Sequence, residues 1–210
     1  MPSSSSPSLA SAARHLRRTD PRLAPIIAQV GPCTLRPDRR AFRTLVESII
    51  SQQISGKAAN AIVGRFRALF PGRPFPSPVE VIAIPLERLR GAGLSNQKAA
   101  YVLDLAAKFA DGTIRPARFS HMGDDEIAEQ LIQVKGIGRW TAEMFLIFAL
   151  NRLDVLPVGD LGLRAAVQRL YHLRKLPSAA TIERLAEPWH PYCTVATWYL
   201  WRSLSLDGAG

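Results

Sequence analysis

A four-residue turn, Lys135-Gly136-Ile137-Gly138, separates two segments whose apolar residues have helical spacing. Residues 124–134 before the turn and residues 140–150 after it repeat apolar positions every three or four residues, as an amphipathic helix does. The two glycines permit positive φ and remove side chains that would keep another backbone away. The amides of such a turn and of the following helix start suit a phosphate group. The sequence therefore predicts a helical hairpin, which either binds phosphate or is an ordinary tight turn.

The rest of the chain is also helical in pattern. Helix starts are expected at Asp20-Pro21 and Ser77-Pro78, where a capping residue precedes a proline. The best candidate strand, Asp154–Val158, contains Pro157, which disfavours a place in a sheet. We therefore expect an all-α protein of about ten helices. The further apolar stripes cover residues 42–50, 58–69, 95–110, 160–172, 178–186 and 191–204.

Composition narrows the partners and the cofactors. The chain has 27 basic and 17 acidic residues in 210, and its net charge of +10 favours a polyanion such as nucleic acid, although a merely solvated basic surface would have the same composition. No uncharged apolar run reaches the roughly 18–20 residues of a membrane span, so no membrane partner is expected. The two cysteines, Cys33 and Cys193, form no CxxC motif, which indicates a reducing compartment and argues against a structural zinc or an iron–sulfur cluster.

The first 18 residues are rich in serine, alanine and arginine and contain no acidic residue. We expect residues 1–18 to be a disordered N-terminal tail, because the segment has few large apolar residues to bury. In a eukaryote the same composition would also fit a mitochondrial transit peptide.

Asp160 lies where a turn, residues 157–160, meets the start of a helix. An aspartate at this place is most often an N-cap, which the helix dipole and the first amides stabilise. Those same amides would hold the carboxylate ionised and fixed in direction, so capping is compatible with a role in chemistry.

Two blocks, VKGIGRWTA at residues 134–142 and DVLPVGDLGLR at residues 154–164, resemble the helix-hairpin-helix DNA glycosylases. The branch they resemble most is 3-methyladenine DNA glycosylase II, which acts on alkylated bases. The block FRTLVESIISQQIS at residues 42–55 fits the same family, as does Gly93-Leu94-Ser95 with Lys98 and Ala99. The resemblance extends from about Asp20 to Arg202.

The resemblance implies a two-lobed helical bundle of the HhH-GPD type over residues 19–210, with the hairpin at 124–150 and a catalytic loop at 152–160. Too few residues precede the first motif for the small N-terminal β-domain of longer relatives, which implies a more open pocket. By matching position, Asp160 is the family's catalytic aspartate. A fixed anion favours the positive charge that develops on the sugar as the N-glycosidic bond breaks.

Family members that also cut the strand have a lysine that forms a Schiff base, and Trp140 stands in its place here. The resemblance therefore implies a monofunctional enzyme. It also implies a base pocket, in which an electron-rich ring would stack on a positively charged alkylated base. Each aromatic residue is equally expected in the core. The implied pocket residues are Trp140, Met144, Leu161 and Trp201, of which Met144 and Leu161 depart from the family's more aromatic pattern.

Gln53 matches the wedge that fills the space left by a flipped base, although a loop glutamine that caps the next helix is an equal alternative. Ser55 is expected to cap that helix. The expected contacts to the DNA backbone are Ser55, Lys135, Gly136, Gly138 and Thr141. The family pattern further places a Na⁺ or K⁺ ion on the backbone carbonyls of Ile132, Val134 and Gly136, and no other cofactor is expected.

These features predict a monofunctional glycosylase of base excision repair that flips out alkylated purines such as 3-methyladenine and leaves an abasic site. Its partner would be double-stranded DNA with a damaged base, and it would act as a monomer inside the cell. The bacterial cytoplasm or nucleoid is the expected place, or the nucleus or mitochondrion in a eukaryote. Two alternatives stay open: a non-catalytic helix-hairpin-helix DNA-binding module, and a glycosylase for deaminated or oxidised bases.

Overall fold

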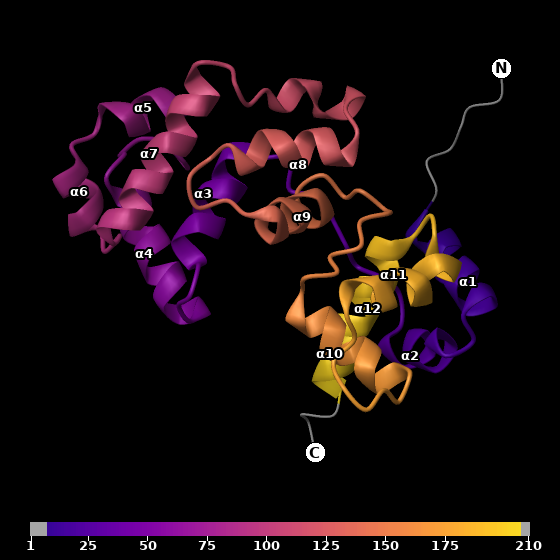
Figure 1. Cartoon of the computed structure of the whole chain (residues 1–210). Coiled ribbons are helices and arrows are strands. Elements are labelled where there is room, and N and C mark those ends of the chain that lie inside the picture. The colour runs from indigo at the N-terminus through magenta and orange to yellow at the C-terminus, as the bar shows by residue number, and fades with distance from the viewer. Residues whose placement is uncertain (1–7, 207–210) are drawn as a thin grey trace. The chain divides into compact units, whose positions relative to one another are not determined.

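The computed structural model describes residues 8–206, and helices are its only regular elements over that range (Figure 1). This confirms the all-α prediction and leaves no strand at residues 154–158. The chain divides into two compact units: residues 1–37 with 150–210, here the terminal unit, and residues 38–149, here the central unit. None of the described helices is long and apolar enough to cross a membrane.

The terminal unit is built around α12 (Cys193–Leu206), whose first eight residues are all buried. This helix packs against α1 (Leu9–Thr19), α2 (Leu23–Val30) and α10 (Leu161–Leu170). The unit also contains α11 (Ala179–Ala186) and the 3-10 helix η2 (Glu187–Trp189).

A buried carboxylate connects the junction of α1 and α2 to other segments of the terminal unit. The side chain of Asp20, only 3% exposed, accepts hydrogen bonds from Tyr171 Oη and Trp189 Nε1 and from the amide of Arg22. Because a buried charge needs such partners, the three donors keep Asp20 in place between α1 and α2.

The predicted disordered tail is wrong for residues 8–18, and residues 1–7 lie outside the described residues. Ser8 caps α1 by accepting a hydrogen bond from the amide of Ser11. Ala12 and Leu16, one helical turn apart, are completely buried, and α1 packs against α2, α12 and η2 of the same unit. Few large apolar residues were therefore enough, because they are spaced on a single helix face and have a ready partner surface.

The central unit contains seven α-helices among its described residues. They are α3 (Ala41–Ser51), α4 (Gly56–Ala68), α5 (Pro78–Ala83), α6 (Leu86–Gly91), α7 (Asn96–Ala110), α8 (Asp124–Ile132) and α9 (Arg139–Phe148), with the 3-10 helix η1 (Pro116–His121) before α8. The pairs α5·α7, α3·α4 and α8·α9 pack closely. Ser55, Ser77 and Ser95 each cap the following helix, which explains why these boundaries are readable from the sequence.

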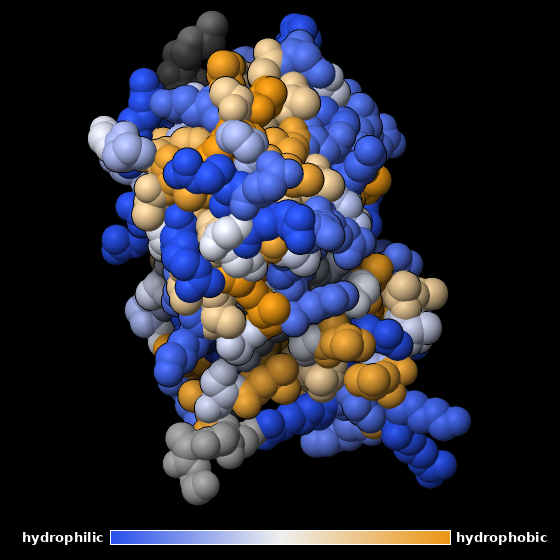
Figure 2. Space-filling model, turned by 90° about the vertical axis from the view of Figure 1, so that its left-hand side faces the viewer, coloured by the Kyte–Doolittle hydropathy of each residue, from blue (hydrophilic) through white to orange (hydrophobic). Residues whose placement is uncertain are grey.

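Hydrophobic side chains come to the surface in several separate groups among hydrophilic ones on the face that Figure 2 shows. Within the central unit, Val79, Ile82 and Leu86 of α5 and α6 are among the exposed large apolar residues. Scattered exposed residues of this kind are normal for a folded protein and by themselves mark no site.

Candidate functional site

The hairpin forms as predicted, with α8 ending at Ile132 and α9 beginning at Arg139. Arg139 joins the two helices, because its guanidinium group pairs with Asp125 of α8 at 2.7 Å and with Glu143 of α9 at 3.1 Å. The cap position of α9 is Gly138, which has no side chain to bond the first amides of the helix. The first amides of α9, at the positive end of the helix dipole, therefore receive no hydrogen bond from the side chain of the cap residue.

The two glycines of the turn have different reasons to be glycine. Gly136 has φ +82°, and a Cβ there would overlap the ring of Tyr101 from α7. Gly138 has φ −95°, and a Cβ there would meet no described heavy atom within 4 Å. The fold thus requires Gly136, whereas Gly138 leaves open space in front of the helix start.

Lys135 lies in the turn with an exposed side chain, but its backbone amide is occupied. The amide donates to Asp104 Oδ2 at 2.9 Å, and Asp104 also pairs with Lys108 at 2.9 Å. Desolvation alone would raise the pKa of Asp104, yet the bonds from Lys108 and from this amide lower it overall. A phosphate contact by Lys135 therefore has to come from its ammonium group.

The loop between α3 and α4 is tied to the hairpin. Gln52 Nε2 donates to the carbonyl of Gly136 at 2.9 Å. Lys98 Nζ donates to the carbonyls of Ile50 at 2.7 Å and of Gln52 at 2.6 Å, and burial lowers its pKa. The sequence indicates no role for Lys98 or Gln52, because both make their contacts with residues far away in the chain.

Gln53 follows this anchored loop with an exposed side chain and φ 57°, in the left-handed region. The next helix, α4, is capped by Ser55, whose Oγ accepts a hydrogen bond from the amide of Ala58. The predicted capping role of Ser55 is confirmed, and Gln53 is not the cap of α4. The wedge role of Gln53 and a phosphate contact at Ser55 stay predictions.

Of the expected pocket residues in the central unit, Trp140 is well exposed at 48%. Met144 is half-buried and lines a small cavity of about 150 Å³ together with Thr141 and Phe148. The side chain of Thr141 is buried, so a phosphate contact there has to come from its amide in the first turn of α9.

Two of the three carbonyl groups that are expected to bind a cation already accept one hydrogen bond each. The carbonyl of Val134 accepts the amide of Ile137 at 3.1 Å, and that of Gly136 accepts Gln52 Nε2. A carbonyl oxygen has two lone pairs, so both retain one for an ion. Carbonyl oxygens are a ligand type that hard cations take, and the cation at Ile132, Val134 and Gly136 stays a prediction.

Asp160 caps α10 as its position predicts. Its Oδ1 accepts a hydrogen bond from the amide of Leu163 at 2.7 Å and a second from Trp201 Nε1 at 2.8 Å. Two donors on one oxygen fix the plane of the carboxyl group. Trp201, expected as a pocket residue, is therefore also a partner of Asp160, which the sequence did not reveal because 41 positions separate them.

Gly162 makes room for this arrangement. A Cβ at this position would lie 3.1 Å from Asp160 Oδ1 and 3.2 Å from Trp201 Nε1. The adjacent Leu161, another expected pocket residue, is 67% exposed. A Cβ at Gly162 would therefore press on both partners of this hydrogen bond, which would have to shift by a few tenths of an ångström.

The loop that leads to Asp160 is fastened to α12 by Thr194. The Thr194 hydroxyl donates to the carbonyl of Arg152 at 2.6 Å and accepts from the amide of Val155 at 3.0 Å. The amide of Thr194 donates to the carbonyl of Leu153 at 3.0 Å. These bonds replace a sheet or helix as the support of an irregular segment.

Comparison with known proteins agrees with this geometry. The model of the HhH-GPD superfamily base excision DNA repair proteins matches residues 46–191. DNA-3-methyladenine glycosylase 1 of Schizosaccharomyces pombe is 35% identical over 203 residues, which are 95% of this chain and 89% of the relative. The alkylbase DNA glycosidase-like protein mag2 of the same yeast is 32% identical, with 95% of both chains covered.

Solved structures give the same result. The S. pombe 3-methyladenine DNA glycosylase in complex with abasic DNA superposes with a TM-score of 0.80 at 35% identity, over 92% of this chain and 96% of that one. DNA-3-methyladenine glycosidase of Bacillus halodurans has a TM-score of 0.86 at 34% identity, over 94% of this chain and 91% of that one. The chain belongs to the HhH-GPD superfamily of base excision DNA repair proteins, alongside these 3-methyladenine glycosylases.

Proposed function

We propose that the protein is a DNA glycosylase that removes alkylated purines such as 3-methyladenine from double-stranded DNA and leaves an abasic site. The observation that carries the proposal is the carboxylate of Asp160, held at the start of α10 by the Leu163 amide and the Trp201 indole. The names of the relatives support the choice of alkylated bases. We further propose that it acts inside the cell as a monomer.

In this reaction the bond between the base and C1′ of the sugar breaks, and the base leaves with the bonding electrons. Positive charge develops on the sugar, and a fixed anion stabilises that charge more than it stabilises the ground state. The oxygen of a water molecule then bonds to C1′ and loses a proton to the solvent. Asp160 supplies the anion, and its preset direction means that no reorientation is needed as the charge develops.

The proposal assigns the binding of the flipped base to aromatic stacking. Alkylation often gives the base a positive charge, which the face of an indole attracts. Trp140 offers an exposed indole at the start of α9. Because Trp140 also stands where strand-cutting relatives have their lysine, we propose hydrolysis without strand cleavage. Gln53 would occupy the space that the flipped base leaves in the duplex.

The DNA backbone would be bound by the hairpin and by the start of α4. The first-turn amides of α9, the open space at Gly138 and the ammonium group of Lys135 suit one phosphate. The first-turn amides of α4 behind Ser55 suit another. A Na⁺ or K⁺ ion on the carbonyls of Ile132, Val134 and Gly136 would add positive charge beside the first phosphate.

The decisive experiment is a lesion panel. The full chain is incubated with duplexes that contain 3-methyladenine, a deaminated purine, an oxidised purine or no damage. Base release is measured by chromatography, and abasic sites are measured by cleavage in alkali. We expect release of the alkylated base, with Asp160→Asn as the inactive control. Release of only the deaminated or oxidised base would replace the proposed substrate, and binding without any release would favour the non-catalytic module.

A further inference from the structure

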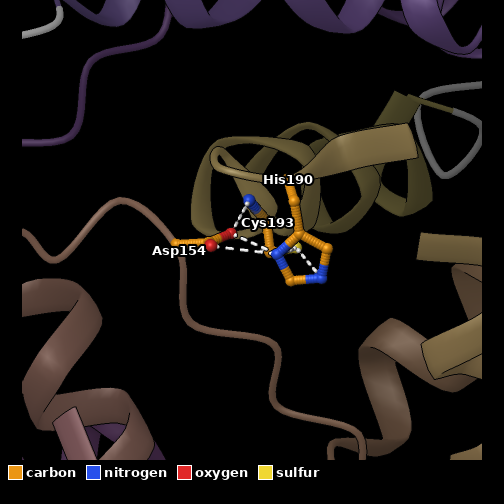
Figure 3. Close-up of side chains that lie close together, drawn as sticks. All are labelled: Asp154, His190 and Cys193. Atoms are coloured by element: carbon orange, nitrogen blue, oxygen red, sulfur yellow. Dashed lines mark hydrogen bonds and ion pairs between the residues drawn. The ribbon is translucent and has the colours of Figure 1, made fainter. Parts of the chain in front are cut away.

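Three side chains of different chemistry meet in the terminal unit (Figure 3). They are Asp154 from the loop before α10, His190 after η2, and Cys193 at the first position of α12. His190 Nδ1 lies 2.9 Å from both carboxylate oxygens of Asp154 and 3.5 Å from Cys193 Sγ. The thiol is buried, whereas the other two side chains are exposed by 37% and 46%.

The two-cysteine count argued against a structural zinc, because clusters built from thiolates need paired cysteines. The structure assembles a mixed donor set instead, from residues 36 and 39 positions apart in the sequence. A thiol, an imidazole and a carboxylate are the three ligand types that zinc uses in proteins. The proposed excision chemistry assigns no task to any of the three.

We propose that Asp154, His190 and Cys193 bind a Zn²⁺ ion, with its fourth position open to water. Each residue supplies one atom, and these atoms all lie within 4.8 Å of one another. Because the imidazole and the carboxylate are exposed, the ion can reach the site from solvent. The sulfur is buried and would bind the ion from the protein side. Three protein ligands with one open position are also an established zinc arrangement.

Two of the three distances between the donor atoms are close to those of a loaded site. Zinc bonds of about 2.0–2.3 Å at tetrahedral angles separate nitrogen from sulfur by about 3.6 Å and nitrogen from oxygen by about 3.3 Å. The observed N···S distance of 3.5 Å already matches, and the N···O distance of 2.9 Å has to widen slightly. The exposed His190 ring has room for this movement.

The carboxylate has an outer partner of the kind that metal ligands use. Asp154 Oδ1 accepts a hydrogen bond from the amide of Cys193 at 3.2 Å, which leaves Oδ2 for the ion. Such outer bonds orient a ligand before the metal arrives. The bound ion would join the loop before α10 directly to the start of α12, beside the Thr194 bonds.

Cobalt tests the proposal, because Co²⁺ takes zinc sites and shows a sulfur-to-metal charge-transfer band when a thiolate binds it. The reduced full chain is titrated with CoCl₂, and the band is measured in the parent, in Cys193→Ser and in Cys33→Ser. Cys33 is the matched control, since it is the protein's other cysteine. We expect a band at one cobalt per chain in the parent and in Cys33→Ser, and none in Cys193→Ser.

Two further measurements sharpen the result. Asp154→Asn should weaken cobalt binding by at least about tenfold, because a charged ligand is lost. Zinc should abolish the band and raise the melting temperature of the parent but not of Cys193→Ser, because a ligand stabilises the state that binds it. Absence of the band in the folded parent at millimolar cobalt would overturn the proposal, as would a band that depends on Cys33. The three residues would then form only an ion pair that caps α12.

Discussion

The Asp160 region of the terminal unit and the hairpin of the central unit use their glycines in opposite ways. At Asp160, the carboxylate has two donors from its own chain, and a Cβ at Gly162 would crowd both Asp160 and Trp201. At the hairpin, Gly138 faces open space and leaves α9 without a side-chain cap. The carboxylate of Asp160 is thus oriented by its own chain, whereas the first amides of α9 receive no bond from the side chain of their cap residue. This difference supports the proposed division between a catalytic group and a phosphate-binding turn.

The largest effect is expected when the charge of Asp160 is removed. Asp160→Asn keeps the size of the side chain and should lower excision of an alkylated base by at least about 100-fold, the order found for a main electrostatic stabiliser. Affinity for DNA should fall little or rise, because a negative charge near phosphate is lost. Single-turnover base release and a binding titration measure both. An excision rate near that of the parent would show that another group is the catalytic carboxylate.

A smaller loss is expected when only the orientation of Asp160 is disturbed. Trp201→Phe keeps an aromatic ring but removes the Nε1 donor, and a hydrogen bond to a charged group is worth about 1.5–3 kcal/mol. We expect single-turnover excision to slow by roughly ten- to a hundredfold. Trp198→Phe on the same helix is the matched control and should excise at the parental rate. Equal rates for the two variants would show that the Trp201 bond does not serve the reaction.

The hairpin should respond in binding rather than in chemistry. Gly138→Val fills the open space at the start of α9 and should weaken binding to damaged and undamaged duplexes alike by several-fold, because backbone contacts carry no lesion information. The slope of log affinity against log salt concentration should become shallower by about one, the change expected for the loss of one phosphate contact. Gly64→Val is the control, since Gly64 is also exposed with nothing near its Cβ position.

Gly136, the other glycine of the turn, is expected to matter for the stability of the fold. Gly136→Ala should cost more than about 1 kcal/mol of unfolding free energy, because the residue has positive φ and Tyr101 occupies the space. Gly138→Val should leave the melting temperature nearly unchanged. If Gly138→Val binds like the parent, the hairpin is only a structural turn. If both variants melt early, the distinction between the two glycines fails.

The last prediction is a negative result, the absence of a covalent adduct between the protein and DNA. Borohydride reduces a Schiff base to a stable bond, and the parent should give no trapped protein–DNA adduct above background during excision, because Trp140 cannot form one. A bifunctional glycosylase is the positive control. Efficient trapping would contradict a purely hydrolytic enzyme, and Lys135→Met would then test the nearest lysine of the turn.

Local signals were enough for much of the fold. Ser55 and Asp160 cap helices through bonds that span three residues, and the glycines of the hairpin interrupt two clear helical periods. The same rules failed for residues 8–18, because whether Ala12 and Leu16 find a surface to bury against depends on α12, far along the chain. Local composition therefore underestimated that helix.

The features of the site that the sequence did not predict are contacts between segments far apart in the chain. The bonds of Trp201 to Asp160 and of Gln52 to Gly136 span 41 and 84 positions. No period or turn motif encodes such pairs, because they exist only after helices pack. The resemblance to a family supplied the residues but not these bonds, so Trp201 was expected beside a base rather than beside a carboxylate.

The bonds of Lys98 and Gln52 have a consequence for the energetics of DNA binding. They connect the loop that presents Gln53 to α7 and to the hairpin turn before any DNA is present. The conformational entropy of ordering this loop is therefore lost during folding and not during association. If Gln53 is the wedge, such preorganisation would leave more of the contact energy for opening the duplex. Under the proposed function, this loop and the hairpin turn would meet DNA as a preformed surface.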